Sequence, residues 1–436
     1  MIESELPKGW NKVKLLDIAD LSTGKVDANH STEDGLYPFF TCASEPMKSP
    51  DYNFDDESVI VPGNGANVGC VLYYNGKFQA YQRTYVLSNI KIVPKYLYYH
   101  FLRYWKERTE NNQFGSATNY VKLINFANYI VDMPSLTEQK QIAEKLDKLF
   151  DQIETIKESS NKIPELLKNF RQQVLTYAVT GKLTEEWRNN NNVNLIRIID
   201  QLKEQRINEV SSKVLKEKLE KIYIDNNSSI DFPIPEQWIP INLDKICESF
   251  SYGTSSKSMN EGTYPVLRMG NIQNGKLIWS DLKYTSDESE YIKYQLNVGD
   301  VLFNRTNSPE LVGKTAIYDE DKKACYAGYI IRIDPYREYV NPYYLNIVLN
   351  SQYAKRWCWE HKSDGVSQSN INAQKLSKFT IPYPHIEEQN IIVERVQSLF
   401  AKLDAIEDKY NFMLENLGKL PQALLCKAFK GEMFTK

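Results

Sequence analysis

Three residues in the second half of the chain have the types and spacing of a metal-dependent nuclease site. Asp300 is followed by Glu320 and Lys322 in "GDVLF…YDEDKK". In such a site two carboxylates hold Mg²⁺ and the lysine positions the attacking water. A second interpretation is structural: Asp300 ends a turn before the strand 301–303, and "DEDKK" is a solvated hairpin turn. The corresponding segment of the first half, "YYNGKFQAY", has no such acidic pair, which favours the structural interpretation.

Other catalytic motifs are absent from the sequence. It has no GxxxxGK[ST] phosphate loop, no GxGxxG after a strand, no HExxH, no GxSxG and no Asp/Asn-Pro-Pro-aromatic signature of an amino-methyltransferase. The 6 cysteines form no CxxC pair and the 4 histidines lack metal-ligand spacing. We therefore expect reduced thiols and no zinc site.

Polar loop segments offer side chains suited to reading DNA. In the major groove Asn and Gln pair with adenine and Arg with guanine, while Lys and glycine-rich backbone contact phosphate. The candidate DNA-binding residues are Asn64, Asn67, Arg83, Thr118, Asn119, Lys122, Arg268, Asn271, Asn304, Arg305, Asn307, Lys314, Gln368 and Asn370. The alternative is that these segments are ordinary β-turn loops, in which Asn, Gly and Ser are common for conformational reasons.

The charge of the chain argues against a DNA binder that works alone. Residues 1–136 contain 13 basic and 15 acidic side chains, and residues 230–384 contain 17 and 18. Free-standing DNA-binding domains are usually basic, so the positive surface must be local or a partner must supply it. The start of the chain is acidic, and no apolar run approaches the ~20 residues of a membrane span. These features predict a cytoplasmic protein.

A long stretch of the sequence is repeated 250 residues later. Between Pro134 and Gly181, 15 of 48 positions are identical to their partners in the second copy. Each half also opens alike, with "LPKGW" at 6–10 and "IPEQW" at 234–238. The chain is therefore two tandem copies of one module. Two copies can place similar surfaces about an internal two-fold axis, which suits duplex DNA.

Each repeat contains a heptad pattern with alternating steps of four and three residues, which indicates a coiled-coil seam. Its main positions are Ile142, Leu146, Leu149, Ile153, Ile156 and Leu167 in the first copy, and Ile392, Val396, Leu399, Leu403, Ile406 and Leu417 in the second. Because the chain must return between the copies, we expect the two helices to pair antiparallel. Pro164 and Pro421 should kink or restart them. The alternative is an ordinary amphipathic helix packed on its own domain.

The predicted fold is α+β. Two β-rich domains, related by internal duplication, are each followed by a long α-helix, and the two helices pair as an antiparallel coiled coil. The domains contain short β-branched and aromatic runs bounded by turn residues, with one helical patch each. The predicted boundaries are 1–133 for the first domain, 134–184 for the first long helix, 185–233 for a helical, Asn-rich connector, 234–383 for the second domain and 384–436 for the second long helix.

These features together resemble the specificity (S) subunit of type I DNA restriction–modification systems. The opening "LPKGW" and "IPEQW" segments match, and "PSLTEQKQI" (134–142) and "PHIEEQNII" (384–392) match the entry into the conserved helix. Residues 163–184 and 420–433 match its helix-closing segments. The second copy departs from the first where "KIP" (162–164) is replaced by "FML" (412–414). The resemblance covers essentially the whole chain.

The resemblance implies a non-catalytic subunit that binds two methyltransferase (M) subunits through its helices, with two restriction/translocase (R) subunits added in the holoenzyme. Each domain would read one half of a split double-stranded DNA target. Adenines would be methylated with S-adenosylmethionine held by the partner, so no cofactor is expected on this chain. Surfaces on one face of the duplex lie ~10 bp apart, which leaves an unread gap of about 6–8 bp. The alternatives are the nuclease described above and an assembly scaffold that does not bind DNA.

Overall fold

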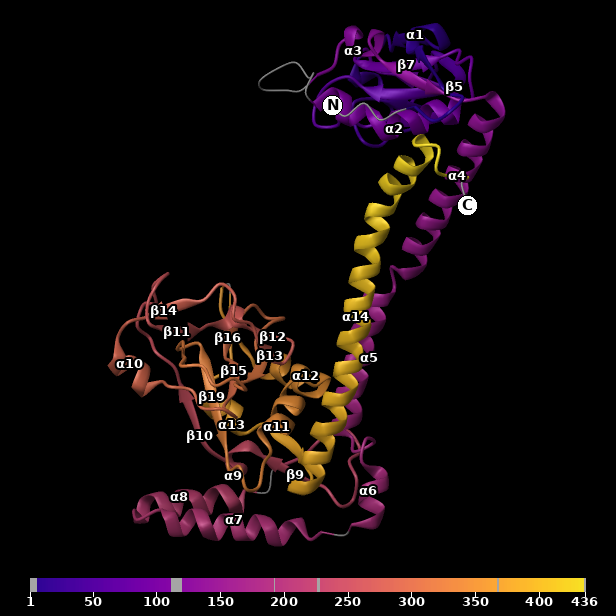
Figure 1. Cartoon of the computed structure of the whole chain (residues 1–436). Coiled ribbons are helices and arrows are strands. Elements are labelled where there is room, and N and C mark those ends of the chain that lie inside the picture. Colours follow the sequence, from indigo (N-terminus) through magenta and orange to yellow (C-terminus); the bar gives the residue numbers. More distant parts are fainter. Residues whose placement is uncertain (1–5, 111–119, 192, 226–227, 367, 435–436) are drawn as a thin grey trace. The chain divides into compact units, whose positions relative to one another are not determined.

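The chain folds as two compact units. The computed structural model describes residues 6–110, 120–191, 193–225, 228–366 and 368–434. Unit 1 comprises residues 1–162 and 409–436, and unit 2 comprises residues 163–408. Each unit contains one β-rich domain and a part of each long helix (Figure 1). The units therefore cut across the predicted segments, because each domain packs on parts of both helices.

The first domain is built around a six-stranded sheet with the order β2-β7-β5-β6-β3-β4. Its strands are β2 (Asp20–Thr23), β3 (Tyr37–Phe40), β4 (Met47–Ser49), β5 (Phe54–Pro62), β6 (Leu72–Ala80) and β7 (Thr84–Ser88). The apolar run from Val59 to Val61 in β5 is fully buried. A short continuous apolar run of this kind is typical of a central strand covered on both faces.

A small ladder and several helices complete the first domain. Strand β1 (Asn11–Lys14) pairs antiparallel with β8 (Ile130–Met133), and the helices are α1 (Leu15–Ile18), η1 (Ala28–His30), α2 (Pro94–Glu110) and α3 (Leu123–Ala127). The rings of Phe101, Trp105, Phe126 and Tyr129 are buried and in contact with one another. Aromatic side chains bury large apolar areas, so this core holds α2 firmly in the domain.

The second domain repeats this plan with additions. A four-stranded sheet has the order β10-β19-β15-β17, and a three-stranded sheet has the order β14-β11-β18. The strands are β9 (Ile239–Asn242), β10 (Cys247–Tyr252), β11 (Tyr264–Leu267), β12 (Ile272–Gln273), β13 (Lys276–Leu277), β14 (Lys283–Thr285), β15 (Val301–Asn304), β16 (Thr306–Asn307), β17 (Thr315–Ile317), β18 (Cys325–Tyr326), β19 (Ile330–Pro335), β20 (Ser363–Asp364), β21 (Ser369–Asn370) and β22 (Thr380–Tyr383). The helices are α9 (Leu243–Ile246), η2 (Met269–Asn271), α10 (Glu288–Lys293), α11 (Pro342–Leu349), α12 (Gln352–His361) and α13 (Ala373–Ser377).

One strand of the first domain corresponds to two strands of the second. Strand β6 pairs antiparallel with β5 and, at its end, parallel with β3. In the second domain β17 pairs antiparallel with β15, whereas β18 pairs parallel with β11 in another sheet. The intervening segment 318–324 contains "DEDKK". The prediction of a hairpin turn there is wrong, because the segment carries the chain from one sheet to the other.

The two long helices differ in continuity. The first consists of α4 (Leu136–Ser160) and α5 (Ile163–Val179), and the second is α14 (Ile386–Phe429). Pro164 stands in the first turn of α5, where its missing N–H is not needed, so the predicted restart is confirmed. Pro421 lies inside α14, which does not restart there. Leu425 and Phe429 beyond it are buried, and their packing offsets the hydrogen bond lost at the proline.

The helices pair antiparallel within unit 2. Arg171 on α5 contacts Asp404 at 2.6 Å and Glu407 at 3.0 Å on α14. Just after the end of α5, the carbonyl of Leu183 accepts a hydrogen bond from Arg395 on α14. The partners thus move backwards along α14 as the chain moves forwards from α5. This confirms the predicted antiparallel pairing.

Each domain packs on the start of its own long helix and on the end of the other. The core of unit 1 includes Ile142, Leu146, Leu425, Ala428 and Phe429. The core of unit 2 includes the residues 250 positions away, namely Ile392, Val396, Leu175, Ala178 and Val179. The two copies therefore use the same helical positions to hold their domains.

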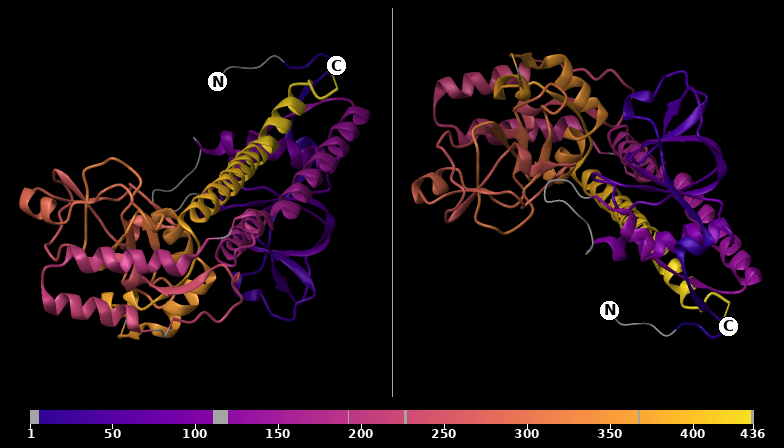
Figure 2. Two further views of the ribbon diagram at one scale, coloured as in Figure 1. Left: turned by 90° about the horizontal axis from the view of Figure 1, so that it is seen from below. Right: turned by 90° about the horizontal axis from the view of Figure 1, so that it is seen from above.

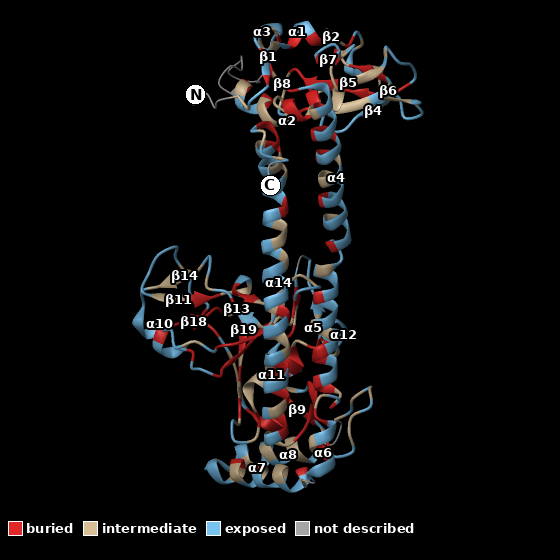
Figure 3. Cartoon of the chain, turned by 45° about the vertical axis from the view of Figure 1, so that its right-hand side comes forward, coloured by how far each residue is buried: buried red, intermediate tan, exposed pale blue. Residues whose placement is uncertain are grey.

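The predicted seam is buried along most of its length, as Figure 3 shows in red on α4, α5 and α14. The buried members are Ile142, Leu146, Ile153, Leu167, Ile392, Val396, Leu403 and Leu417, and Leu149 and Leu399 are half-buried. Ile156 and Ile406 are 42% and 49% exposed, so the prediction that these two are buried in the seam is wrong. The first seam positions of each helix contact their own domain, as the alternative interpretation had it.

A repeated glutamate anchors the tryptophan that opens each domain. The indole N–H of Trp10 donates to Glu138 at 3.1 Å, and that of Trp238 donates to Glu388 at 2.8 Å. Each glutamate lies in the first turn of a long helix, at matching positions of the repeat. The glutamate of the repeated motif thus ties the start of a domain to the helix that follows it.

The glutamine after each glutamate has an equally specific partner. Gln139 accepts the backbone N–H of Val93 at 3.1 Å, and Gln389 accepts that of Asn341 at 2.8 Å. These donors stand immediately before α2 and α11, where backbone N–H groups lack partners within the helix. Both glutamines are buried. The glutamine of the "EQ" pair thus caps the domain helix in both copies.

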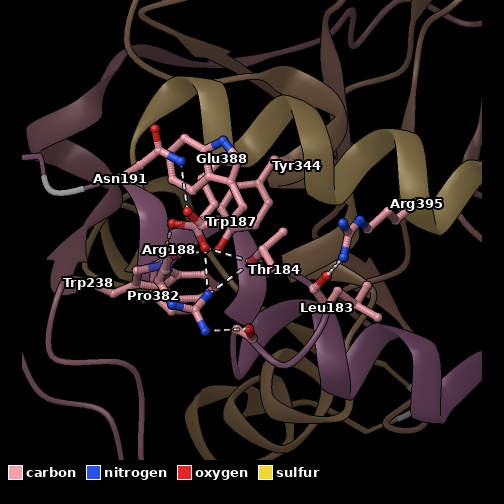
Figure 4. Close-up of polar contacts among 11 residues, drawn as sticks. Leu183, Thr184, Trp187, Arg188, Asn191, Trp238, Tyr344, Pro382, Glu388 and Arg395 are labelled. Atoms are coloured by element: carbon pink, nitrogen blue, oxygen red, sulfur yellow. Dashed lines mark hydrogen bonds and ion pairs between the residues drawn. The ribbon is translucent and has the colours of Figure 1, made fainter.

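The second glutamate belongs to a larger buried network (Figure 4). Glu388 also accepts from Arg188 and from the Thr184 hydroxyl, both at 2.6 Å, and Arg188 donates to the carbonyl of Gly181 at 2.7 Å. Glu388 is 2% exposed and Arg188 is 8% exposed. This ion pair joins the connector to the first turn of α14.

The connector forms helices α6 (Glu185–Asn190), α7 (Leu195–Glu209) and α8 (Lys213–Ile224), and α7 and α8 lie side by side (Figure 2). Arg206 of α7 is buried and donates to the carbonyls of Asp244 and Lys245 at 2.8 and 3.1 Å. The matching carbonyl of the first domain, that of Asp17, accepts from Lys91 of the same domain at 3.0 Å. In the first domain the donor to this carbonyl is therefore a residue of the domain itself, whereas in the second domain the donor belongs to the connector.

Two glycines that close the helices should not tolerate alanine. Gly181 and Gly431 have φ of +73° and +72°, and an added Cβ would lie 2.5 Å from Pro235 and 2.9 Å from Pro7, respectively. Each Gly→Ala variant should lose on the order of 1–3 kcal/mol of stability. The matched control is Gly418 in α14, where a Cβ would meet nothing within 4 Å. Gly418→Ala should stabilise by ~1 kcal/mol. Urea denaturation measures all three, and equal effects would contradict the prediction.

Candidate nucleic-acid interface

Two candidate loops of the second domain meet in a small three-stranded sheet. Strand β16 pairs antiparallel with β21, which pairs with β20. The register places Thr306 opposite Asn370 and Asn307 opposite Ser369. The "FNRTNSP" and "SDGVSQSNIN" segments, which are 60 residues apart in the sequence, are therefore neighbours. Gln368, in the turn between β20 and β21, is exposed.

Arg305 lies at the edge of this small sheet with its guanidinium held in place. The group stacks over the ring of Tyr252 at 4.5 Å and donates to the side-chain oxygen of Asn370 at 3.4 Å. The Tyr252 hydroxyl in turn accepts the backbone N–H of Ala373 at 2.9 Å. Among the described residues Arg305 forms no ion pair, and the nearby Glu310 is not paired with it. Tyr252 was missed from sequence, because nothing in its own segment distinguishes it.

Two predicted contacts of the second domain point inward. Asn304 is fully buried, and Asn271 is 3% exposed. The Asn271 amide donates to the carbonyls of Ile278 and Ser280 at 2.9 and 3.1 Å, so it holds its own turn together. Neither side chain can reach DNA from these positions. We therefore remove both from the candidate set.

The remaining candidates of the second domain are accessible but partly engaged. Arg268 is paired with Asp281 at 3.2 Å, and Lys314 donates to Gln273 at 2.8 Å. Beside β21, the exposed carboxylate of Asp364 accepts from Lys362 and Ser369, and these hydrogen bonds lower its pKa. Its negative charge is therefore largely compensated at this edge.

The first domain brings its candidate loops together in the same way. Asn64 and Tyr120 form an antiparallel bridge, and Val121 donates its N–H to the carbonyl of Gly63 at 2.9 Å. Arg83 is exposed at the neighbouring backbone position, and Lys122 is exposed beside Tyr120. The side chain of Asn67, by contrast, donates to the carbonyl of Cys42 at 2.7 Å, which holds its own loop. Thr118 and Asn119 lie outside the described residues.

The nuclease constellation does not assemble. Asp300 is 1% exposed, accepts the N–H of Asn297 at 2.9 Å and lies 3.3 Å from Arg337. Burial raises the pKa of Asp300, although backbone hydrogen bonding and nearby arginines oppose this. Glu320 and Lys322 pair with each other at the surface. The described residues contain no group of three or more His, Cys, Asp or Glu that could hold a metal ion.

Large apolar side chains are exposed on the long helices. Within unit 2 these are Leu166, Phe170, Tyr177 and Ile406, and within unit 1 they are Ile156, Phe412 and Leu420. Residues 166, 170 and 177 share one face of α5 by their spacing. Contiguous exposed apolar patches commonly mark surfaces to which another molecule binds. Within the described parts of the chain, no helix has the length and apolar character of a membrane span.

Comparison with known proteins places these features in one family. The family model described as "Type I restriction modification DNA specificity domain" matches residues 7–165 and 235–415. The specificity subunit of the Escherichia coli type I restriction enzyme EcoDI is 33% identical over 99% of this chain and 90% of its own length.

Two solved structures share the fold. One chain, from a study of complex assembly and conformational transition of the type I R-M system, covers 98% of this chain and 100% of its own with a TM-score of 0.65 and 16% identity. The HsdS subunit from Thermoanaerobacter tengcongensis covers 99% of both chains with a TM-score of 0.58 and 16% identity. On the strength of the family model and the sequence relatives, the chain belongs to the type I restriction–modification DNA specificity family.

Proposed function

We propose that this chain is the DNA-recognition subunit of a cytoplasmic type I restriction–modification complex, that it is itself non-catalytic, and that each domain reads one half of a split target. The observation that carries the proposal is the matching cluster of polar loop residues in the two domains, around Arg83 and around Arg305. Such side chains read base edges. The gap between the half-sites is about 6–8 bp, as expected for surfaces one helical turn apart.

The long helices supply the surfaces for other subunits. Exposed apolar residues occur on the long helices of both units, which supports two methyltransferase subunits, one for each unit. These subunits hold S-adenosylmethionine and methylate adenine, and two restriction subunits complete the holoenzyme. The described residues offer no metal cluster for cleavage by this chain itself. This observation disfavours the nuclease alternative.

The test is to reconstitute this chain with its methyltransferase partner and to map methylated adenines on plasmid DNA. The expected result is one bipartite motif with methylated adenine in each half. A chain that acted only as an assembly scaffold would form the complex yet give no sequence-specific methylation. Metal-dependent cleavage by the isolated chain would support the nuclease alternative instead.

The isolated chain should bind DNA weakly. The first domain region has two more acidic than basic residues and the second has one more, by the counts of 13 against 15 and 17 against 18. Affinity for duplex DNA rises with the number of phosphates neutralised. Adding the methyltransferase should therefore tighten binding greatly. Fluorescence anisotropy over a salt series measures this, and tight, salt-insensitive, sequence-specific binding by the chain alone would contradict it.

A further inference from the structure

Equivalent backbone positions in the two domains can be matched by their hydrogen bonds. In the first domain Gly63 donates to the carbonyl of Arg83 at 3.0 Å, and Val121 donates to that of Gly63 at 2.9 Å. In the second domain Arg305 donates to the carbonyl of Tyr329 at 3.0 Å, and Ile371 donates to that of Arg305 at 2.9 Å. Position 63 therefore corresponds to 305, and 83 to 329.

Each domain has one arginine in this pair of matched positions, but the two arginines are attached to different strands. The second domain carries it at position 305, whereas the first domain has Gly63 there. A Cβ on Gly63 would lie 2.2 Å from the carbonyl oxygen of Arg83, so no side chain fits at that position. The first domain has its arginine one strand away, at position 83. An arginine therefore lies next to this backbone position in both domains, although in the first domain it is attached one strand away.

Arg83 and Arg305 also differ from the other arginines of the two domains in the groups that they contact. Within the described residues, neither Arg83 nor Arg305 forms an ion pair. The other arginines of the two domains bind a carboxylate or a backbone carbonyl: Arg103 with Glu107, Arg108 with the Ile130 carbonyl, Arg268 with Asp281, Arg332 and Arg337 with Asp300, and Arg356 with Asp231. Arg83 and Arg305 thus remain available to a ligand at matching sites.

The chemistry of the second site favours a base over a phosphate. Tyr252 supports one face of the Arg305 guanidinium, and Asn370 accepts from one of its terminal nitrogens. A planar fork fixed in this way is suited to a flat acceptor pair, and the O6 and N7 atoms of guanine form one in the major groove. A phosphate can also accept this fork through two oxygens, but lysine can replace arginine there because the contact needs only a positive charge.

We propose that Arg83 and Arg305 each read one guanine, one in each half-site, at matching places in the two halves of the target. This inference rests on the proposed function and adds a base identity to it. It also explains why Gly63 and Arg83 occur together in the first domain while Arg305 and Tyr329 occur together in the second.

The test uses the reconstituted complex and duplexes in which every base pair of the mapped target is substituted in turn. Arg305→Ala should reduce discrimination at one G·C pair of the second half-site by about 5- to 150-fold, the range for a bidentate contact. Arg83→Ala should do the same in the first half-site only. Arg→Lys at each position keeps the charge but loses the fork, so it should lose the same discrimination. The controls are Arg103→Ala and Arg356→Ala, whose arginines are ion-paired elsewhere in each domain.

The outcomes separate this inference from the proposed function. If the alanine variants weaken methylation uniformly for every base, and lysine restores it, the arginines contact phosphate and the inference is wrong. Unchanged discrimination in all variants would also overturn it, as would a half-site without guanine. If the unmodified complex methylates no bipartite motif at all, the proposed function itself fails.

Discussion

Replacing Glu388 with glutamine should lower the free energy of unfolding of unit 2 by about 3–5 kcal/mol, the usual cost of leaving a buried charge without its partner. The carboxylate lies 2.6 Å from Arg188 and accepts from the Trp238 indole at 2.8 Å, with Arg188 8% and Glu388 2% exposed (Figure 4). Glutamine keeps the shape but removes the negative charge that balances the guanidinium. Replacing both Arg188 and Glu388 with methionine should recover most of the loss, because no unpaired charge then remains buried.

The first copy offers the matched control. Glu138 is half-buried and accepts from Trp10 at 3.1 Å, with no arginine pair among the described residues. Glu138→Gln should therefore cost only about 1 kcal/mol, as for an ordinary hydrogen bond. Hydrogen exchange of the peptides around Trp10 and Trp238 reports the two units separately during urea denaturation. Equal losses at the two positions would show that Arg188 contributes nothing.

Acidification from pH 6.5 towards 4 should destabilise unit 1 by roughly 3 kcal/mol through His100. The imidazole is fully buried, and desolvation lowers its pKa to about 4. Its Nε2 accepts the backbone N–H of Asp132 at 3.2 Å, and its Nδ1 lies 3.0 Å from the Tyr129 hydroxyl. The folded state thus holds a neutral ring. A depressed histidine pKa means that stability is complete above the unfolded value near 6.5 and is lost as the pH falls towards 4.

The second copy shows how the same site works without histidine. Val348 stands at the position of His100, and Pro382, which has no N–H, stands at that of Asp132. His100→Val alone should cost about 1–3 kcal/mol at pH 7, because the buried N–H of Asp132 loses its acceptor. His100→Val with Asp132→Pro removes the donor as well and should restore most of that stability. Both variants should lose the pH dependence between 6.5 and 4 in urea titrations. A surviving dependence would mean that another group titrates there.

The repeat and its heptads were sufficient to predict two domains, two long helices and their antiparallel pairing. Heptad spacing shows which face of a helix is buried but not what covers it. The first seam positions, such as Ile142 and Ile392, therefore turned out to contact their own domains. Pro421 illustrates a second limit. A proline predicts a weak point in a helix, but packing at Leu425 and Phe429 decides whether the helix continues.

The candidate interface was predictable in its loops and less so in its residues. Loop composition selected segments that the fold does bring together, including those of Arg305 and Asn370. Composition cannot distinguish an amide facing solvent from one that closes its own turn, which is why Asn271 and Asn304 were wrongly included. The contribution of Tyr252 depends on Arg305, 53 residues away in the sequence, and no local pattern encodes it.

The split composition of unit 1 has a consequence for how the chain is made. The core of its β-rich domain includes Ile142 and Leu146 but also Leu425, Ala428 and Phe429, which leave the ribosome only after all of unit 2 has been synthesised. Unit 2, a continuous stretch of residues, can finish folding earlier. The domain that is translated first is thus the last to be completed. A chain truncated before Leu425 would display an unfinished first domain and would be more open to proteolysis.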